Sequence, residues 1–187
     1  MHALDANGAT HHVSRLTFDA PRDSLGGTMS QHRYSAIPRV LCFVRHKGRW
    51  LLIHRAADRR LWPNLYNGVG GHVEEGEGIL AAARRELWEE AGLTADGLRL
   101  RGVIHEMEGD HGVVVFVFTG TCRRARLRES AEGTPGWFTD EEALGLPLVA
   151  DVGLILGRLL AMRPGDPPFI ARSQTDAAGS PMLTFEA

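Results

Sequence analysis

The chain has 187 residues, of which 43% are hydrophobic and 24% are charged. These proportions are typical of a globular domain and exclude wholesale disorder. Twenty-one basic and 23 acidic residues give a net charge of −2, which argues against a general coating of polyanions. Lys47 is the only lysine and lies in His46-Lys47-Gly48. A P-loop needs Gly-Lys followed by Ser or Thr, so P-loop NTPases are excluded.

The cysteines and the lengths of the apolar runs predict in which cellular compartment the protein resides. Cys42 and Cys122 lie in apolar runs without metal-ligand spacing, so we expect two buried, reduced thiols. Residues 1–16 lack the continuous apolar region of a signal peptide. The uncharged run from Gly112 to Cys122 is far shorter than the ~20 residues of a membrane helix. We therefore expect a cytoplasmic protein with no membrane contact.

Composition divides the chain into three parts. Residues 1–35 are rich in His, Gly, Ser, Asp and Thr and show no helix or strand period, so we expect a disordered arm. Residues 36–163 are expected to form the main domain, and residues 164–187 a C-terminal extension. In that extension, two β-rich runs flank Asp176-Ala177-Ala178-Gly179, a pattern that predicts a closing β-hairpin.

The main domain opens with strand signals. Val40–Val44 and Trp50–Ile53 are β-rich runs around the turn His46-Lys47-Gly48, which predicts a hairpin. A loop over residues 56–64 leads to the glycine-dense segment Asn67-Gly68-Val69-Gly70-Gly71-His72-Val73. This segment is not a dinucleotide fingerprint, because the third glycine of G-x-G-x-x-G would fall on Val73.

The remaining elements alternate between helix and strand. Residues 78–91 are good helix formers followed by Gly92 in the C′ position, which predicts the clearest helix of the chain. Further strands are predicted at residues 103–105 and 113–119, and helices at 140–144 and 151–162. Mixed elements with short connections predict an α/β or α+β sandwich.

The predicted helix over residues 78–91 carries an unusual acidic face. At about 100° per residue, Glu86, Glu89 and Glu90 fall on one arc, and Arg85 supplies the one cation four residues before Glu89. Like charges at this spacing repel, so the face is either solvated or completed by a hard cation such as Mg²⁺, which prefers oxygen ligands. Gly70 could bring a backbone carbonyl close to such a metal.

These residues form a known pattern. The stretch Gly71-x5-Glu77-x7-Arg85-Glu86-Leu87-x-Glu89-Glu90-x-Gly92-Leu93 resembles the Nudix box, with every defining position filled. The resemblance implies an α/β fold, a Nudix-type α/β/α sandwich with a mixed sheet. It also implies hydrolysis of a nucleoside diphosphate linked to another group, with Mg²⁺ or Mn²⁺ as cofactor.

The resemblance also assigns roles. It implies that the catalytic and metal-binding carboxylates are Glu86, Glu89 and Glu90, with the Gly70 carbonyl as a further ligand. Structural support of the box would come from Gly71, Glu77, Arg85 and Gly92. One of the glutamates, or a nearby acid, would activate the attacking water. Such enzymes often use an acid from a later loop, and the choice among Glu106, Glu108 and Asp110 stays open.

A looser resemblance concerns the substrate. The segments 66–71, 137–138 and 147–151 are similar to MutT-like oxidised-purine nucleotide diphosphatases, which implies cleavage of a purine nucleoside triphosphate to monophosphate and pyrophosphate. Asn67 would bind a purine edge; Asp151 would do likewise or only cap a helix. Trp137 would stack on the base or pack in the core. Residues outside these segments with an open role, either phosphate contact or solvated loop, are Arg55, Arg59 and Arg60.

Three alternatives remain. The first is a Nudix hydrolase of ADP-ribose, a nucleotide sugar or a dinucleotide. The second is an isopentenyl-diphosphate isomerase, which is disfavoured because that family has a cysteine where this chain has Gly70. The third, from another class, is a non-catalytic Nudix-fold ligand sensor, although no box carboxylate is lost here. The expected partner is a small nucleotide and no nucleic acid polymer, with the chain a monomer or homodimer.

Overall fold

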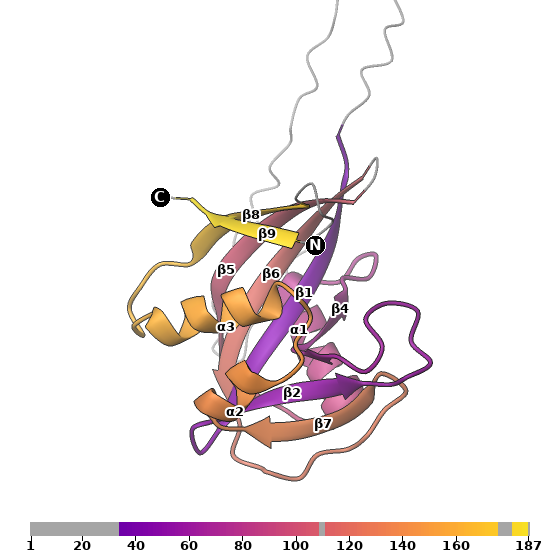
Figure 1. The fold of residues 1–187 in the computed structure, drawn as a ribbon, viewed down its shortest axis with the longest axis vertical. Coiled ribbons are helices and arrows are strands. Elements are labelled where there is room, and N and C mark those ends of the chain that lie inside the picture. Colours follow the sequence, from indigo (N-terminus) through magenta and orange to yellow (C-terminus); the bar gives the residue numbers. More distant parts are fainter. Residues whose placement is uncertain (1–33, 109–110, 176–180, 187) are drawn as a thin grey trace, which may run out of the picture. The chain divides into compact units, whose positions relative to one another are not determined.

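The computed structural model describes residues 34–108, 111–175 and 181–186 (Figure 1). The predicted arm therefore lies outside the described residues except for its last two positions, and so does the turn over residues 176–179. The nine strands of the described part are β1 (Ala36–His46), β2 (Arg49–Arg55), β3 (Tyr66–Asn67), β4 (Val69–His72), β5 (Asp96–Glu108), β6 (His111–Thr121), β7 (Gly133–Phe138), β8 (Phe169–Thr175) and β9 (Pro181–Phe185). Its helices are α1 (Ile79–Ala91), α2 (Asp140–Gly145) and α3 (Val152–Ala161).

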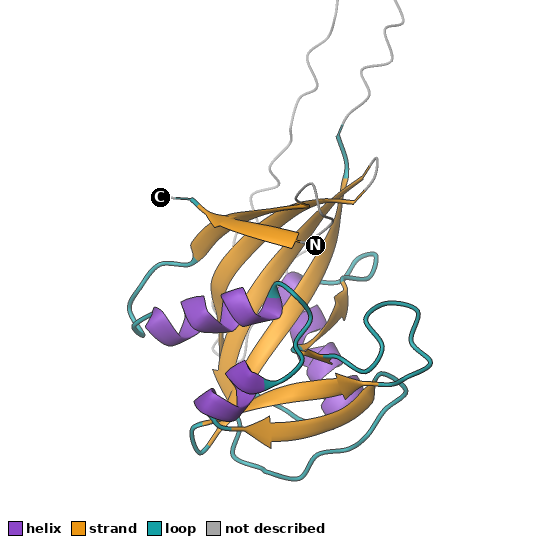
Figure 2. Cartoon of the chain, in the orientation of Figure 1, coloured by secondary structure: helices purple, strands orange, loops and turns teal. Residues whose placement is uncertain are grey.

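The strands form one mixed sheet with the order β3-β2-β1-β6-β5-β8-β9. Strand β4 pairs with β1, and β7 pairs with β2. The β1–β6 and β5–β8 pairs are parallel, and the other pairs are antiparallel. Helix α1 covers one face, whereas α2 and α3 cover the other (Figure 2). The predicted α/β/α sandwich with a mixed sheet is thereby confirmed.

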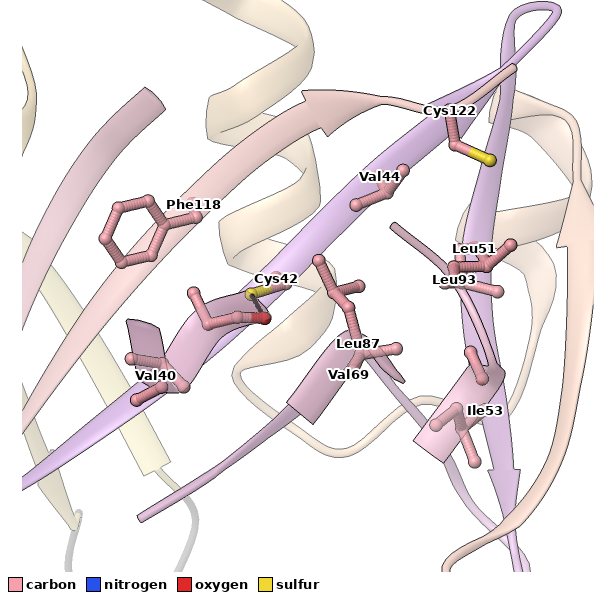
Figure 3. Packing of buried hydrophobic residues seen from close by; sticks show 13 residues of the cluster. Val40, Cys42, Val44, Leu51, Ile53, Val69, Leu87, Leu93, Phe118 and Cys122 are labelled. Atoms are coloured by element: carbon pink, nitrogen blue, oxygen red, sulfur yellow. Dashed lines mark hydrogen bonds between the residues drawn. The ribbon is translucent and has the colours of Figure 1, made fainter. Parts of the chain in front are cut away.

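Alternation along the central strands supplies both cores, because successive side chains of a strand point to opposite faces. In β1, Val40, Cys42 and Val44 belong to the core beneath α1, whereas Phe43 belongs to the core beneath α3. Figure 3 shows the α1-side core, in which Leu87 of the helix packs against the sheet. Cys42 and Cys122 are both free and buried, as expected.

The predicted hairpin of β1 and β2 is confirmed. Arg45 faces Trp50, and His46 faces Arg49. The two-residue turn between the strands has positive φ angles at Lys47 (47°) and Gly48 (82°), as a type I′ turn requires. Both strands are longer than the apolar runs that predicted them.

Three strands, β3, β4 and β7, were not predicted. Most of the glycine-dense segment is β3 and β4 rather than a loop, and Gly70 lies so close to β1 that a Cβ atom would come within 2.1 Å of the Val40 carbonyl oxygen. Strand β7 contains Pro135 and two glycines, residues that weaken a strand prediction. It pairs with β2 alone in the described residues, and an edge position tolerates proline.

Helix α1 is confirmed, and its ends are set by glycines. Gly78 is the N-cap, and Gly92 closes the helix in the left-handed conformation (φ 69°) with its N–H directed to carbonyls of the last turn. The buried apolar residues Ala82, Ala83 and Leu87 face the sheet. No helix in the part of the chain that the structure describes is long and apolar enough to span a membrane.

Candidate functional site

Strand β4 brings its two adjacent glycines against the acidic face of α1. The Gly70 N–H donates to Oε2 of Glu90 at 3.2 Å. A Cβ atom on Gly71 would lie 2.3 Å from Oε1 of Glu86. Glu86 can approach Gly71 this closely only because that position lacks a side chain, whereas the missing side chain of Gly70 lets β4 lie against the Val40 carbonyl of β1.

Arg85 ties the start of the box to the helix. Its guanidinium donates to both carboxylate oxygens of Glu77 at 3.0 Å and to the His72 carbonyl at 2.9 Å. It also donates to Glu86 at 2.9 Å and to Glu89 at 3.0 Å. These hydrogen bonds hold the pKa of the Glu77 carboxyl below its ordinary value. Through these contacts Glu77 and Arg85 hold the loop before α1 against the helix, as a structural role in the box requires.

The two inner carboxylates are short of compensating charge. Glu86 is 8% exposed and Glu90 is 7% exposed. Burial raises the pKa of Glu86, although Arg85 opposes the shift. Burial, together with the charge of Glu86, raises the pKa of Glu90 from its ordinary 4.5 to about 8, and the charge of Glu132 adds to this. A divalent cation bound beside these two buried carboxylates would stabilise their ionised form.

The donor set fits a hard cation. Among the described residues, no three His, Cys, Asp or Glu side chains are gathered closely enough to hold a metal by themselves. Mg²⁺, however, is commonly bound through only one or two carboxylates, with waters and substrate phosphates completing the coordination. Glu86 and Glu90 provide the carboxylates, and the backbone of β4 lies beside them. Glu89 is more exposed, at 54% of its side chain.

A cavity of about 280 Å³ opens beside Glu90. One wall is apolar, with Leu41, Ile104 and Ile155 among its residues. The polar side chains around it are Arg39, Arg55, Arg59, Asn67, His72, Glu90, Glu106, Glu132 and Asp151. The structure therefore brings the box carboxylate and two of the three predicted substrate residues to one cavity.

Asn67 and Asp151 lie on this cavity from different elements. The Asn67 Oδ1 atom accepts the N–H of Gly68 at 2.8 Å, so this side chain also supports the turn between β3 and β4. Asp151 precedes α3, but its side chain makes no capping hydrogen bond. Burial raises the pKa of the Asp151 carboxyl. Asp151 thus lines the cavity, and its role in base recognition stays a prediction.

Trp137 does not line the cavity. Its Nε1–H donates to the Ala125 carbonyl at 2.8 Å, its ring lies 5.5 Å from that of His46, and it packs against the α1-side core. Of its two expected roles, the contacts in the structure are therefore those of core packing. Arg60 is likewise absent from the lining.

Two cavity residues were missed by the sequence analysis. Glu132 pairs with Arg59 at 2.7 Å and with Arg55 at 3.7 Å, and it stands in a loop whose path no local pattern predicts. Trp62 is 44% exposed and has φ 51°, a left-handed conformation that is unusual for a bulky residue. The WPN sequence around Trp62 was the available signal.

The later-loop acids are partly resolved by position. Glu106 lines the cavity. The side chain of Glu108 and the whole of Asp110 lie outside what the structure describes. Three acids from outside α1 therefore line the cavity: Glu106, Glu132 and Asp151.

Comparison with known proteins agrees with this geometry. Over 101 residues the chain is 44% identical to an oxidized purine nucleoside triphosphate hydrolase of Danio rerio, a match that covers 53% of this chain and 64% of that protein. The chain thus spans less than two thirds of that relative. A MutT protein of Methanosarcina mazei Go1 has 27% identity and a TM-score of 0.59, covering 69% of this chain and 98% of the other. A MutT protein of Bacillus halodurans shares the fold, with a TM-score of 0.68, 24% identity, and 80% and 97% coverage. The NUDIX domain family matches residues 36–168, and the chain therefore belongs to the NUDIX family.

Proposed function

We propose that this protein is a divalent-cation-dependent hydrolase of nucleoside diphosphates linked to another group. Its preferred substrate would be a purine nucleoside triphosphate, oxidised purines included, which it would cleave to monophosphate and pyrophosphate. The observation that carries the proposal is the buried pair Glu86 and Glu90 against Gly70 and Gly71, with Glu90 on a cavity that Asn67 and Asp151 also line.

The chain's residues divide the work. Glu86 and Glu90 would hold the cation with the Gly70 carbonyl, and Glu89 would serve from the exposed edge. When bound, Mg²⁺ or Mn²⁺ neutralises phosphate charge and lowers the pKa of a water molecule. A carboxylate of Glu106 or Glu132 on the cavity would accept the proton of the attacking water. No nucleophilic serine or cysteine is required.

Base recognition would use Asn67 and Asp151. An amide offers both donor and acceptor atoms, and a carboxyl of raised pKa offers a donor when it is protonated. A buried site built on such bonds discriminates strongly, because a mismatched base leaves polar groups unpaired. The similarity to the oxidized purine nucleoside triphosphate hydrolase of Danio rerio supports a purine triphosphate.

A substrate panel tests the proposal. Canonical and 8-oxo purine triphosphates, ADP-ribose, nucleotide sugars and dinucleotides would be incubated with Mg²⁺, and the products identified by mass. We expect a purine triphosphate to be preferred, pyrophosphate to be released, and all turnover to stop in excess chelator. Preference for ADP-ribose or a nucleotide sugar would overturn the purine assignment alone. Full activity in chelator would overturn the metal mechanism, and no turnover with intact metal binding would favour a sensor.

Trp62 is expected to stack on the base, because it lines the cavity that holds Asn67. Base–aromatic stacking contributes ~1–3 kcal/mol, so Trp62→Ala should raise KM for the preferred purine triphosphate by about tenfold and leave kcat less affected. Trp88→Ala is the matched control, since this exposed tryptophan lies outside the cavity. Equal KM values for the two variants would remove Trp62 from base recognition.

A further inference from the structure

A second cavity lies beside the C-terminal end of α1, away from the carboxylates. Its volume is about 730 Å³. Four of its lining residues are arginines of the segment between β6 and β7, namely Arg123, Arg124, Arg126 and Arg128. Asp96 is the one acid among the described lining residues. We call it the arginine cavity. The net charge of −2 therefore averages over a strongly basic and a strongly acidic region of the chain.

Two of the four arginines contact other residues of the fold. Arg128 donates to the Trp88 carbonyl at 2.7 Å, and its guanidinium lies 5.3 Å from the centre of the Trp88 ring. It thus covers the last turn of α1. Arg123 pairs with Asp96 at 3.2 Å, but these side chains are 92% and 62% exposed. Such an exposed pair contributes little to stability.

The guanidinium groups of the other two arginines make no such contacts in the described structure. Arg124 and Arg126 are exposed, and neither has an ion-pair or hydrogen-bond partner for its guanidinium among the described residues. The residues between and after them fix the backbone: the Ala125 carbonyl accepts from Trp137, and Leu127 packs against the α1-side core. The segment therefore presents, within the described structure, two cations without a protein partner beside two others, a charge that a bound anion would complement.

Trp88 adds an aromatic surface to this charge. It lines the arginine cavity, and it is 54% exposed, although an indole in water forgoes the stabilisation of burial. Positive charge along a groove with an exposed aromatic ring is the combination that binds single-stranded nucleic acid, since phosphates pair with the cations and bases stack on the ring. An acidic peptide would use the arginines but not the indole.

We propose that the arginine cavity binds single-stranded nucleic acid, with phosphates on Arg124 and Arg126 and a base on Trp88. The four arginines occur within six consecutive positions, so they can meet several phosphates of one strand. The earlier expectation of no nucleic acid polymer rested on the charge of the whole chain and does not take account of this local concentration. The inference is independent of the proposed hydrolysis, because none of these residues lines the catalytic cavity.

Fluorescence anisotropy with a labelled single-stranded oligothymidylate, in chelator, tests the inference. The double variant Arg124→Ala/Arg126→Ala should bind at least tenfold more weakly at low salt. Its slope of log K against log salt should be smaller by about 1.4, because each phosphate contact on a single strand contributes ~0.7. Trp88→Ala should weaken binding without changing the slope, and Arg124→Lys/Arg126→Lys should keep most of the affinity.

The matched control is Arg49→Ala/Arg172→Ala, which removes the same charge from two exposed positions outside the cavity. It should retain wild-type affinity. Equal losses in the two double variants, or an unchanged Arg124→Ala/Arg126→Ala protein, would overturn the proposal. If thymidine monophosphate bound as tightly as the oligonucleotide, the ligand of this cavity would be a small anion and not a nucleic acid strand. Polyglutamate that binds as tightly would replace it by an acidic protein. Thermal melting of each variant establishes that it is folded.

Discussion

Glu90→Gln is expected to lower turnover by ~10²–10⁴-fold, the range for a carboxylate that supports metal binding or base catalysis. Glu90 is buried, lies on the cavity, and is bonded to the backbone of β4. The amide keeps the size of the side chain and removes the negative charge that would hold a cation. Steady-state pyrophosphate release with saturating Mg²⁺ measures the loss. Near-normal turnover would mean that the acidic face of α1 is only solvated.

The same substitution should stabilise the protein in chelator, and only above acidic pH. The folded-state pKa of Glu90 is raised to about 8 from an ordinary 4.5, so ionisation costs more in the folded than in the unfolded chain. Stability is therefore lost as pH rises from about 4.5 through 8. Glu90→Gln does not suffer this loss. Between pH 5 and pH 8.5 its Tm should exceed that of the wild type by a growing margin, and its free energy of unfolding should become larger by on the order of a few kcal/mol.

Glu89→Gln is the matched control for stability, since that side chain is 54% exposed. It should show no comparable gain in Tm over the same pH range. A gain that is equal in the two variants would assign the effect to net charge rather than to the burial of Glu90.

Gly71→Ala is expected to lower turnover by about 10²-fold or more, because a misplaced catalytic group costs this much. The added Cβ would meet Oε1 of Glu86 at 2.3 Å and its Cδ at 2.7 Å. Arg85 fixes this carboxylate from the other side at 2.9 Å, so the methyl group must displace either the glutamate or β4. We also expect destabilisation of ~1–3 kcal/mol from overpacking. Activity and urea unfolding measure the two effects.

Gly78→Ala is the control for Gly71→Ala. A Cβ atom on Gly78 meets nothing within 4 Å, and its φ of −80° suits any residue. This variant should keep its turnover. Normal activity of Gly71→Ala would show that Glu86 needs no fixed position for catalysis.

The sequence predicted those parts of the site that depend on local order. The spacing of Glu86, Glu89 and Glu90 along one helix is a property of the chain itself, and Gly92, which ends α1, is equally local. The hairpin of β1 and β2 was predictable for the same reason, since its turn residues adjoin both strands.

Long-range pairing determined what the sequence did not predict. Trp137 had two expected roles, stacking on a base or packing in the core, and in the structure this residue of β7, which pairs with β2, packs against the core. The same pairing brings Glu132, just before β7, to the cavity. Trp62 reaches the cavity through a loop held at the Leu61 carbonyl by Arg55, at 3.2 Å. None of these placements follows from neighbouring residues, because each depends on contacts between separate elements.

The pairing of β4 has a consequence for local stability. Among the strands of the described structure, this four-residue strand pairs with β1 alone, whereas β1 also pairs with β6 from Ala36 to Arg45. β4 can therefore separate from β1 without disrupting the rest of the sheet, at less than the cost of global unfolding. Amide hydrogens of Val69 and Gly70 should exchange with solvent faster than those at the centre of β1. A cation bound between β4 and α1 would select the closed arrangement, so the exchange rate of these two amides reports occupancy of the site directly.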